Sequence, residues 1–143
     1  MARYVTTIKS SLPAAAAFSY MANFANARVW DPSVSDARPV DDRPLGVGSA
    51  FDLVARFAGR DVPLCYTIVS YEEPHRVVLE ARRPGFVSRD TITVEPAERR
   101  SNVHYDAILA FNGLGRLLDP VMQRIFNRVG AQATTGMEAA LNP

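Results

Sequence analysis

The segment NVHYDAILAFNGLGRLLDPVMQRIFNRVGAQATTGMEAAL, residues 102–141, changes the period of its apolar residues part-way along. Residues 102–111 alternate as in a β-strand with one apolar face, which carries Val103, Tyr105, Ala107, Leu109 and Phe111. Asp119 is expected as the N-cap of a helix, with Pro120 in its first turn. Beyond them, apolar residues recur every three or four positions: Met122, Ile125, Phe126, Val129, Ala133, Met137, Ala140 and Leu141. The segment therefore predicts a strand followed by a long helix that covers the apolar face of a sheet.

Upstream of this segment, the middle of the chain alternates in the same way. The predicted strands are 34–40, 49–58, 62–71, 76–83 and 86–94, followed by 102–111. Short turns such as Gly59-Arg60-Asp61 and Pro84-Gly85 separate them, so we expect an antiparallel meander.

The beginning of the chain adds one strand and a helical segment. Residues 3–9 are rich in β-formers, and Pro13 suits the first turn of a helix. That helical segment is expected to close at Trp30-Asp31-Pro32. There is no internal repeat or linker, so residues 1–143 are expected to form a single α+β domain.

Charge and composition exclude several classes of function. The 16 Lys and Arg residues balance 15 Asp and Glu, a net charge of +1, which is too small for a nucleic-acid binder that works by counterion release. The motif Gly46-x-Gly48 lacks the Lys-Ser/Thr of a phosphate loop. His75 and His104 lack the spacing of a zinc site, and the single Cys65 predicts neither a disulfide nor a nucleophile. We therefore expect no metal and no cofactor.

No apolar run is long enough to cross a bilayer, and the first residues lack the apolar core of a signal peptide. The expectation is a cytoplasmic protein with no integral membrane association. A homodimer is compatible with the sequence.

The order strand, helical segment, about six strands and one long helix resembles the helix-grip fold of the START-like (SRPBCC) superfamily. More narrowly, it resembles the polyketide cyclase/dehydrase and lipid-transport family. The residues that carry the resemblance are Pro13 with Phe18-Ser19-Tyr20-Met21, Trp30-Asp31-Pro32, Gly46-Val47-Gly48 before Phe51, and Tyr66-x-Ile68-x-x-Tyr71-x-x-Pro74. The resemblance implies a curved antiparallel sheet of about seven strands wrapped around a long C-terminal helix, with a cavity between them.

Projecting the alternating pattern onto that fold gives a set of candidate ligand-binding residues. They are Trp30, Phe51, Leu53, Tyr66, Ile68, Leu79, Asp90, Ile92, Tyr105, Leu109, Met122, Ile125, Phe126 and Val129. The simpler alternative is that these side chains fill a solid core, because apolar residues line pockets and cores alike.

Asp90 is the most informative of these residues. It shares its side of the strand with Ile92 and Val94, so a regular strand turns its carboxylate inward. The structural interpretation is that it pairs with Arg83 or Arg89, or with the backbone. The catalytic interpretation makes it a general acid or base, with Tyr66 or Tyr105 holding a substrate oxygen.

The leading function is binding or transport of a small hydrophobic or amphipathic molecule, a lipid or a polyketide-like compound. The first alternative is a polyketide aromatase/cyclase or dehydratase that uses the same cavity. The second is a protein-interaction module with a vestigial cavity, which requires an exposed apolar patch. The enzyme requires a titratable group that faces the cavity without a structural partner.

Overall fold

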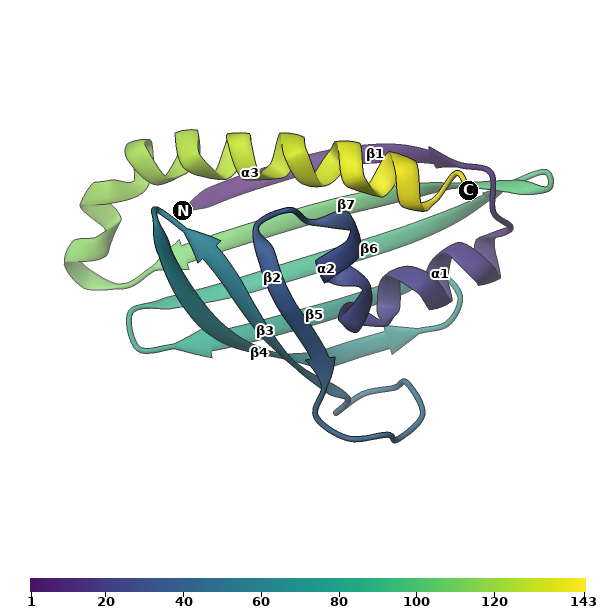
Figure 1. Cartoon of the computed structure of the whole chain (residues 1–143), viewed down its shortest axis with the longest axis horizontal. Helices are drawn as coiled ribbons and strands as arrows, with labels where there is room; N and C mark the ends of the chain where they lie inside the picture. Colours follow the sequence, from purple (N-terminus) through teal and green to yellow (C-terminus); the bar gives the residue numbers. More distant parts are fainter.

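Seven antiparallel strands form one curved sheet in the computed structural model, which describes residues 1–143 (Figure 1). The strands are β1 (Ala2–Ser10), β2 (Val34–Pro39), β3 (Ala50–Phe57), β4 (Arg60–Glu72), β5 (Arg76–Arg83), β6 (Phe86–Ala97) and β7 (Arg100–Phe111). Their order in the sheet is β1-β7-β6-β5-β4-β3-β2, so the first strand lies beside the last. The predicted α+β helix-grip fold is confirmed.

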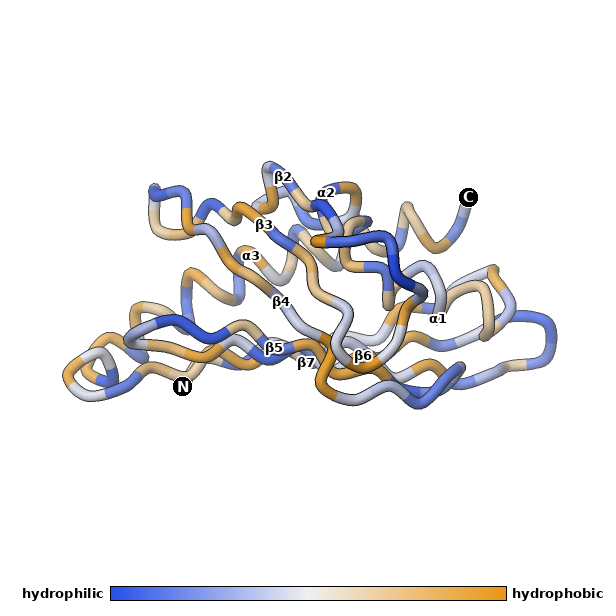
Figure 2. Tube along the Cα trace, turned by 90° about the horizontal axis from the view of Figure 1, so that it is seen from below, coloured by the Kyte–Doolittle hydropathy of each residue, from blue (hydrophilic) through white to orange (hydrophobic).

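One long helix, α3 (Asp119–Ala140), runs along β1 and β7 over one face of the sheet (Figure 1). In Figure 2, β5, β6 and β7 lie below α3, and β4, β3 and β2 rise beside it, so the sheet curls around the helix. A 3-10 turn, η2 (Gly113–Leu118), joins β7 to α3. Asp119 is therefore the first helical residue and not the predicted N-cap, and its carboxylate pairs with the amino group of Met1 instead.

The helical segment after β1 is divided, whereas the pattern predicted one continuous stretch. It consists of α1 (Ala14–Ala22), η1 (Phe24–Asn26) and α2 (Ala27–Trp30). The side chain of Asn23 accepts a hydrogen bond from the backbone N–H of Ala25, which ends α1 and starts a new turn. The break redirects the chain so that Trp30 enters the interior.

These short helices fill one end of the interior with aromatic side chains. Phe18, Phe24 and Trp30 are buried, and their ring centroids lie 5.4 Å from Tyr71, 5.0 Å from Tyr66 and 5.5 Å from Tyr105, respectively. Tilted contacts of this kind add to the burial of apolar area. This end of the sheet is therefore a packed core.

Two glycines let α3 approach its neighbours closely. A Cβ on Gly130 would overlap the ring of Tyr4, and a Cβ on Gly136 would overlap the backbone carbonyl of Trp30. The Tyr4 hydroxyl is also hydrogen-bonded to Thr134 at 2.9 Å. The small residues at these two positions thus serve close packing.

Candidate functional site

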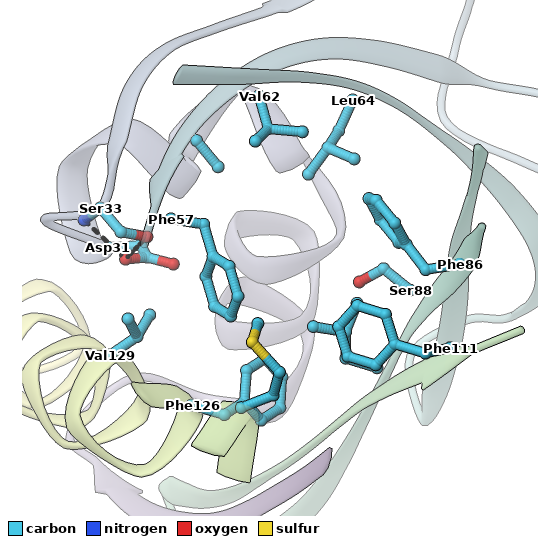
Figure 3. A pocket seen from close by; sticks show the side chains of 13 residues that line it. Asp31, Ser33, Phe57, Val62, Leu64, Phe86, Ser88, Phe111, Phe126 and Val129 are labelled. Atoms are coloured by element: carbon cyan, nitrogen blue, oxygen red, sulfur yellow. Dashed lines mark hydrogen bonds between the residues drawn. The ribbon is translucent and has the colours of Figure 1, made fainter. Parts of the chain in front are cut away.

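An apolar cavity of about 140 Å³ lies at the end of the sheet that the short helices leave uncovered. Its walls are the end of β3, the start of β4, the start of β6, the end of β7 and the first half of α3 (Figure 3). The lining residues are Asp31, Ser33, Ala55, Phe57, Val62, Leu64, Phe86, Ser88, Leu109, Phe111, Met122, Phe126 and Val129. Most of them are hydrophobic, as in sites for small organic ligands.

A smaller cavity of about 60 Å³ adjoins the first and reaches further under α3. The two share Asp31, Ser88, Phe126 and Val129. The smaller cavity adds Tyr4, Asp90, Tyr105, Ala107, Gly130 and Ala133. The larger, mostly apolar cavity, named the outer chamber, therefore shares part of its wall with the smaller one, named the inner chamber, which contains Asp90 and Tyr105.

Asp90 and Tyr105 form a buried pair in the inner cavity. The Tyr105 hydroxyl donates a hydrogen bond of 2.6 Å to Oδ2 of Asp90, and Tyr105 and Asp90 are 6% and 4% exposed, respectively. The pairing of β6 with β5 and β7 has no register shift, so Asp90 faces inward as its position in the strand predicts.

The interior changes the proton affinity of this pair. Burial raises the pKa of Asp90 to about 7; the hydrogen bond from Tyr105 opposes that shift, and the charges of Asp31 and Asp106 add to it. Burial and the charge of Asp90 raise the pKa of Tyr105 well above its ordinary value. Tyr105 is therefore the donor, and Asp90 is the group that exchanges a proton near neutral pH.

The expected pairing of Asp90 with an arginine is wrong. Arg89 donates to Glu80 on the outer face at 2.6 Å, and Arg83 donates to the carbonyl of Pro63 at 2.8 Å. Asp90 also makes no hydrogen bond to the backbone, and its only protein partner is Tyr105. One oxygen of a buried carboxylate is therefore left without a protein donor.

Asp31 is the second carboxylate of the cavity and borders both chambers. Its Oδ1 accepts hydrogen bonds from the backbone N–H and the hydroxyl of Ser33, at 2.9 and 2.7 Å (Figure 3). Its Oδ2 accepts none. Burial raises the pKa of Asp31, and the two bonds from Ser33 oppose that shift.

Tyr66 reaches the cavity only through another side chain. Its hydroxyl is hydrogen-bonded to the hydroxyl of Ser88 at 2.7 Å, and Ser88 lines both chambers. When Tyr66 donates this bond, the proton of Ser88 is free to face a ligand.

Six of the predicted binding residues line the cavities: Asp90, Tyr105, Leu109, Met122, Phe126 and Val129. Eight do not. Trp30, Phe51, Leu53, Tyr66, Ile68, Leu79 and Ile92 are buried at the packed end, and Ile125 is half-buried on α3. The structure thus divides the predicted apolar face between a core and a cavity.

Several residues that line the cavities were not among those predicted from the sequence. Phe57 and Ser88 share the inward side with Leu53 and Asp90, so the alternation could have found them. Asp31 and Ser33 lie in a loop after α2, where no periodicity operates. The other missed residues are Tyr4, Ala55, Val62, Leu64, Phe86, Ala107, Phe111, Gly130 and Ala133.

Exposed apolar side chains lie in the connection between β7 and α3 and at the start of α3. Leu114 and Leu117 in η2 are 84% and 78% exposed, and they lie in the connection between the lining residues Phe111 and Met122. Leu118 and Val121 continue this exposed surface.

The structure contains no group of three or more His, Cys, Asp or Glu side chains placed to hold a metal ion. None of its helices combines the length and apolarity that crossing a membrane requires. Cys65 is exposed.

The sequence matches the family model described as polyketide cyclase / dehydrase and lipid transport over residues 1–142. This chain belongs to that family. A comparison with curated proteins found no match.

Among solved structures, the family fold recurs in proteins of low sequence identity. A START superfamily protein from Mycobacterium smegmatis is 11% identical, with a TM-score of 0.79 over 97% of this chain and 96% of that one. The protein TTHA0849 from Thermus thermophilus is 14% identical, with a TM-score of 0.76 over 98% and 95%. The ZhuI aromatase/cyclase from Streptomyces sp. R1128 is 10% identical, with a TM-score of 0.73 over 97% and 92%. At these identities the likeness shows the fold alone.

Proposed function

We propose that this protein binds a small hydrophobic or amphipathic molecule in the cavity between the curved sheet and α3. The observation that carries this proposal is the unfilled apolar chamber beside a packed core: Phe57, Leu64, Phe86 and Phe126 surround space that no side chain occupies. The family description includes lipid transport, which supports a ligand of this class.

Burial of apolar area provides the driving force. Each ~100 Å² of apolar ligand surface removed from water contributes roughly 2.5 kcal/mol before the costs of immobilising the ligand are deducted. The polar groups of the inner chamber, Asp31, Ser88 and Asp90, then set the ligand's orientation.

The test is a titration with N-phenyl-1-naphthylamine, an uncharged fluorophore that brightens in apolar surroundings. Two valine-to-tryptophan variants give a matched comparison. Val129→Trp places a large ring in both chambers, whereas Val69→Trp places the same ring on β4 at a site that is 46% exposed and outside them. We expect binding in the wild type and in Val69→Trp and its loss in folded Val129→Trp.

Equal binding by all three proteins would show that the fluorophore occupies another surface and would overturn the proposal. Circular dichroism of each variant separates a blocked cavity from an unfolded chain. Native mass spectrometry of the purified wild type, before and after denaturation, adds the mass of any co-purifying molecule.

A second candidate function is catalysis in the same cavity, and it is favoured by the buried Asp90, whose Oδ1 has no protein partner although Tyr105 occupies Oδ2. A carboxyl with a pKa of about 7 exchanges protons readily near neutral pH. In dehydration of a β-hydroxy ketone, Asp90 takes the proton next to the carbonyl. It then returns that proton to the departing hydroxyl, which leaves as water.

This candidate is tested with a β-hydroxy aryl ketone, whose dehydration produces an absorbing enone. Turnover by the wild type, its loss in Asp90→Asn and unchanged fluorophore binding by that variant support catalysis. Equal rates for wild type and Asp90→Asn exclude Asp90 as the acid/base group.

A further inference from the structure

The charged groups that line the two chambers all have one sign. Asp31 and Asp90 are carboxylates, and no lysine, arginine or histidine lines either chamber. The arginines nearest in sequence to Asp90 are engaged elsewhere, because Arg89 binds Glu80 on the outer face and Arg83 donates to the carbonyl of Pro63. A ligand therefore meets two acids and no protein cation.

Each of these carboxylates has one oxygen that the protein leaves free. Tyr105 occupies Oδ2 of Asp90, and Ser33 occupies Oδ1 of Asp31. The other oxygen of each residue accepts no hydrogen bond from the protein, although a carboxylate accepts several. Asp90 is 4% exposed and lines the inner chamber, so its free oxygen faces cavity space and not the surface.

We propose that the ligand carries a cationic hydrogen-bond donor, such as a protonated amine, on an apolar body, and that Asp31 and Asp90 bind this group. The inference rests on the proposed binding function and specifies its ligand class. The apolar body occupies the outer chamber, and the amine donates to the free oxygens of the two acids.

The electrostatics of the chamber favour this class over an anionic amphiphile. The charge of Asp31 raises the pKa of Asp90, and burial raises the pKa of both acids. A bound ammonium group offsets both effects, whereas a fatty or aromatic carboxylate brings another negative charge to acids that already resist ionisation. The ring of Phe126, which lines both chambers, supplies further stabilisation when a cation lies over its face.

Three compounds with one ring system test the proposal: 1-naphthylmethylamine, 1-naphthalenemethanol and 1-naphthoate. Each is titrated by calorimetry into the wild-type protein near neutral pH. We expect the amine to bind about tenfold more tightly than the alcohol, and the carboxylate most weakly.

Isosteric variants show which carboxylates produce the preference for the amine. Asp31→Asn and Asp90→Asn keep the shape of each side chain and remove its charge, so each is expected to weaken amine binding about tenfold and to change alcohol binding by less than about twofold. The control is Asp36→Asn, which removes a carboxylate that is exposed on β2 and outside the chambers. It is expected to leave all three affinities unchanged.

The outcomes separate this proposal from the one on which it rests. If 1-naphthoate binds as tightly as the amine, or if both cavity variants keep wild-type affinity for the amine, the cationic class is wrong and cavity binding still stands. If none of the three compounds and no uncharged fluorophore binds, both proposals fail.

Discussion

Tyr105 donates its hydroxyl proton to Asp90 across two paired strands, with 2.6 Å between the oxygen atoms and both side chains buried. This bond stabilises the ionised form of Asp90, while burial and the charge of Asp31 stabilise the protonated form. Burial prevails, and the carboxyl therefore titrates close to neutral pH. This balance makes the site sensitive to pH and to single-atom changes.

The first prediction is that the free energy of unfolding depends on pH through Asp90. The pKa of Asp90 is raised from 3.8 to about 7 on folding, so the folded state holds its proton more tightly than the unfolded chain. The stabilisation from this proton is fully present below the pKa of Asp90 in the unfolded chain. It is lost as pH rises through the pKa of Asp90 in the folded protein. Between about pH 5 and about pH 8, the wild type should lose roughly 2–3 kcal/mol of unfolding free energy through this group.

Urea unfolding of wild type and Asp90→Asn at several pH values measures this effect. The variant has no carboxyl to titrate, and its stability should change much less over the same range. Parallel pH profiles for the two proteins would show that Asp90 does not titrate as described.

The second prediction concerns Tyr105→Phe. Loss of the hydroxyl removes the one hydrogen bond that lowers the pKa of Asp90, so that pKa should rise above its wild-type value. Carbon-detected NMR titration of the Asp90 carboxyl measures it. The matched control is Tyr66→Phe, which removes a hydroxyl bonded to Ser88 and should leave the midpoint close to that of wild type.

The third prediction concerns the contact of α3 with α2. Alanine usually stabilises a helix relative to glycine, but Gly136→Ala should destabilise the protein by about 2 kcal/mol or more, because the new Cβ overlaps the Trp30 carbonyl. Gly46→Ala is the control, since a Cβ there meets no atom within 4 Å. Thermal unfolding of both variants gives the comparison, and a stabilised Gly136→Ala would contradict the close approach.

The fourth prediction distinguishes the two ends of the sheet. Leu79→Ala removes a fully buried side chain from the packed core and should cost about 2–5 kcal/mol of unfolding free energy. Leu64→Ala removes a side chain that already borders empty space, so it should cost less and enlarge the outer chamber. Denaturant unfolding checks the stabilities, and titration with fluorophores of increasing size checks the enlarged chamber.

Much of the fold followed from periodicity. The alternation in 49–58, 76–83 and 102–111 predicted strands within a few residues of their observed bounds, and the three-and-four spacing after Pro120 predicted α3. The same alternation turned Asp90 inward, where the structure buries it.

The division of the apolar face between core and cavity did not follow from periodicity. It depends on how far α1, η1 and α2 extend over the sheet, and that is set by tertiary packing around Phe24 and Trp30. Leu53 and Phe57 therefore look equivalent in sequence, yet one is core and the other lines the chamber. The position of Asp31 depends on local bonds to Ser33, which no repeating pattern encodes.

The packed core lies at one end of the sheet and the cavity at the other, and this separation has an evolutionary consequence. Residues such as Phe18 and Leu79 carry the stability of the domain, whereas Leu64, Phe86 and Phe111 border space and tolerate changes of volume at lower cost. Selection can therefore reshape the chamber for a new molecule without rebuilding the framework that holds it. A single scaffold can diversify in this way while its backbone stays recognisable.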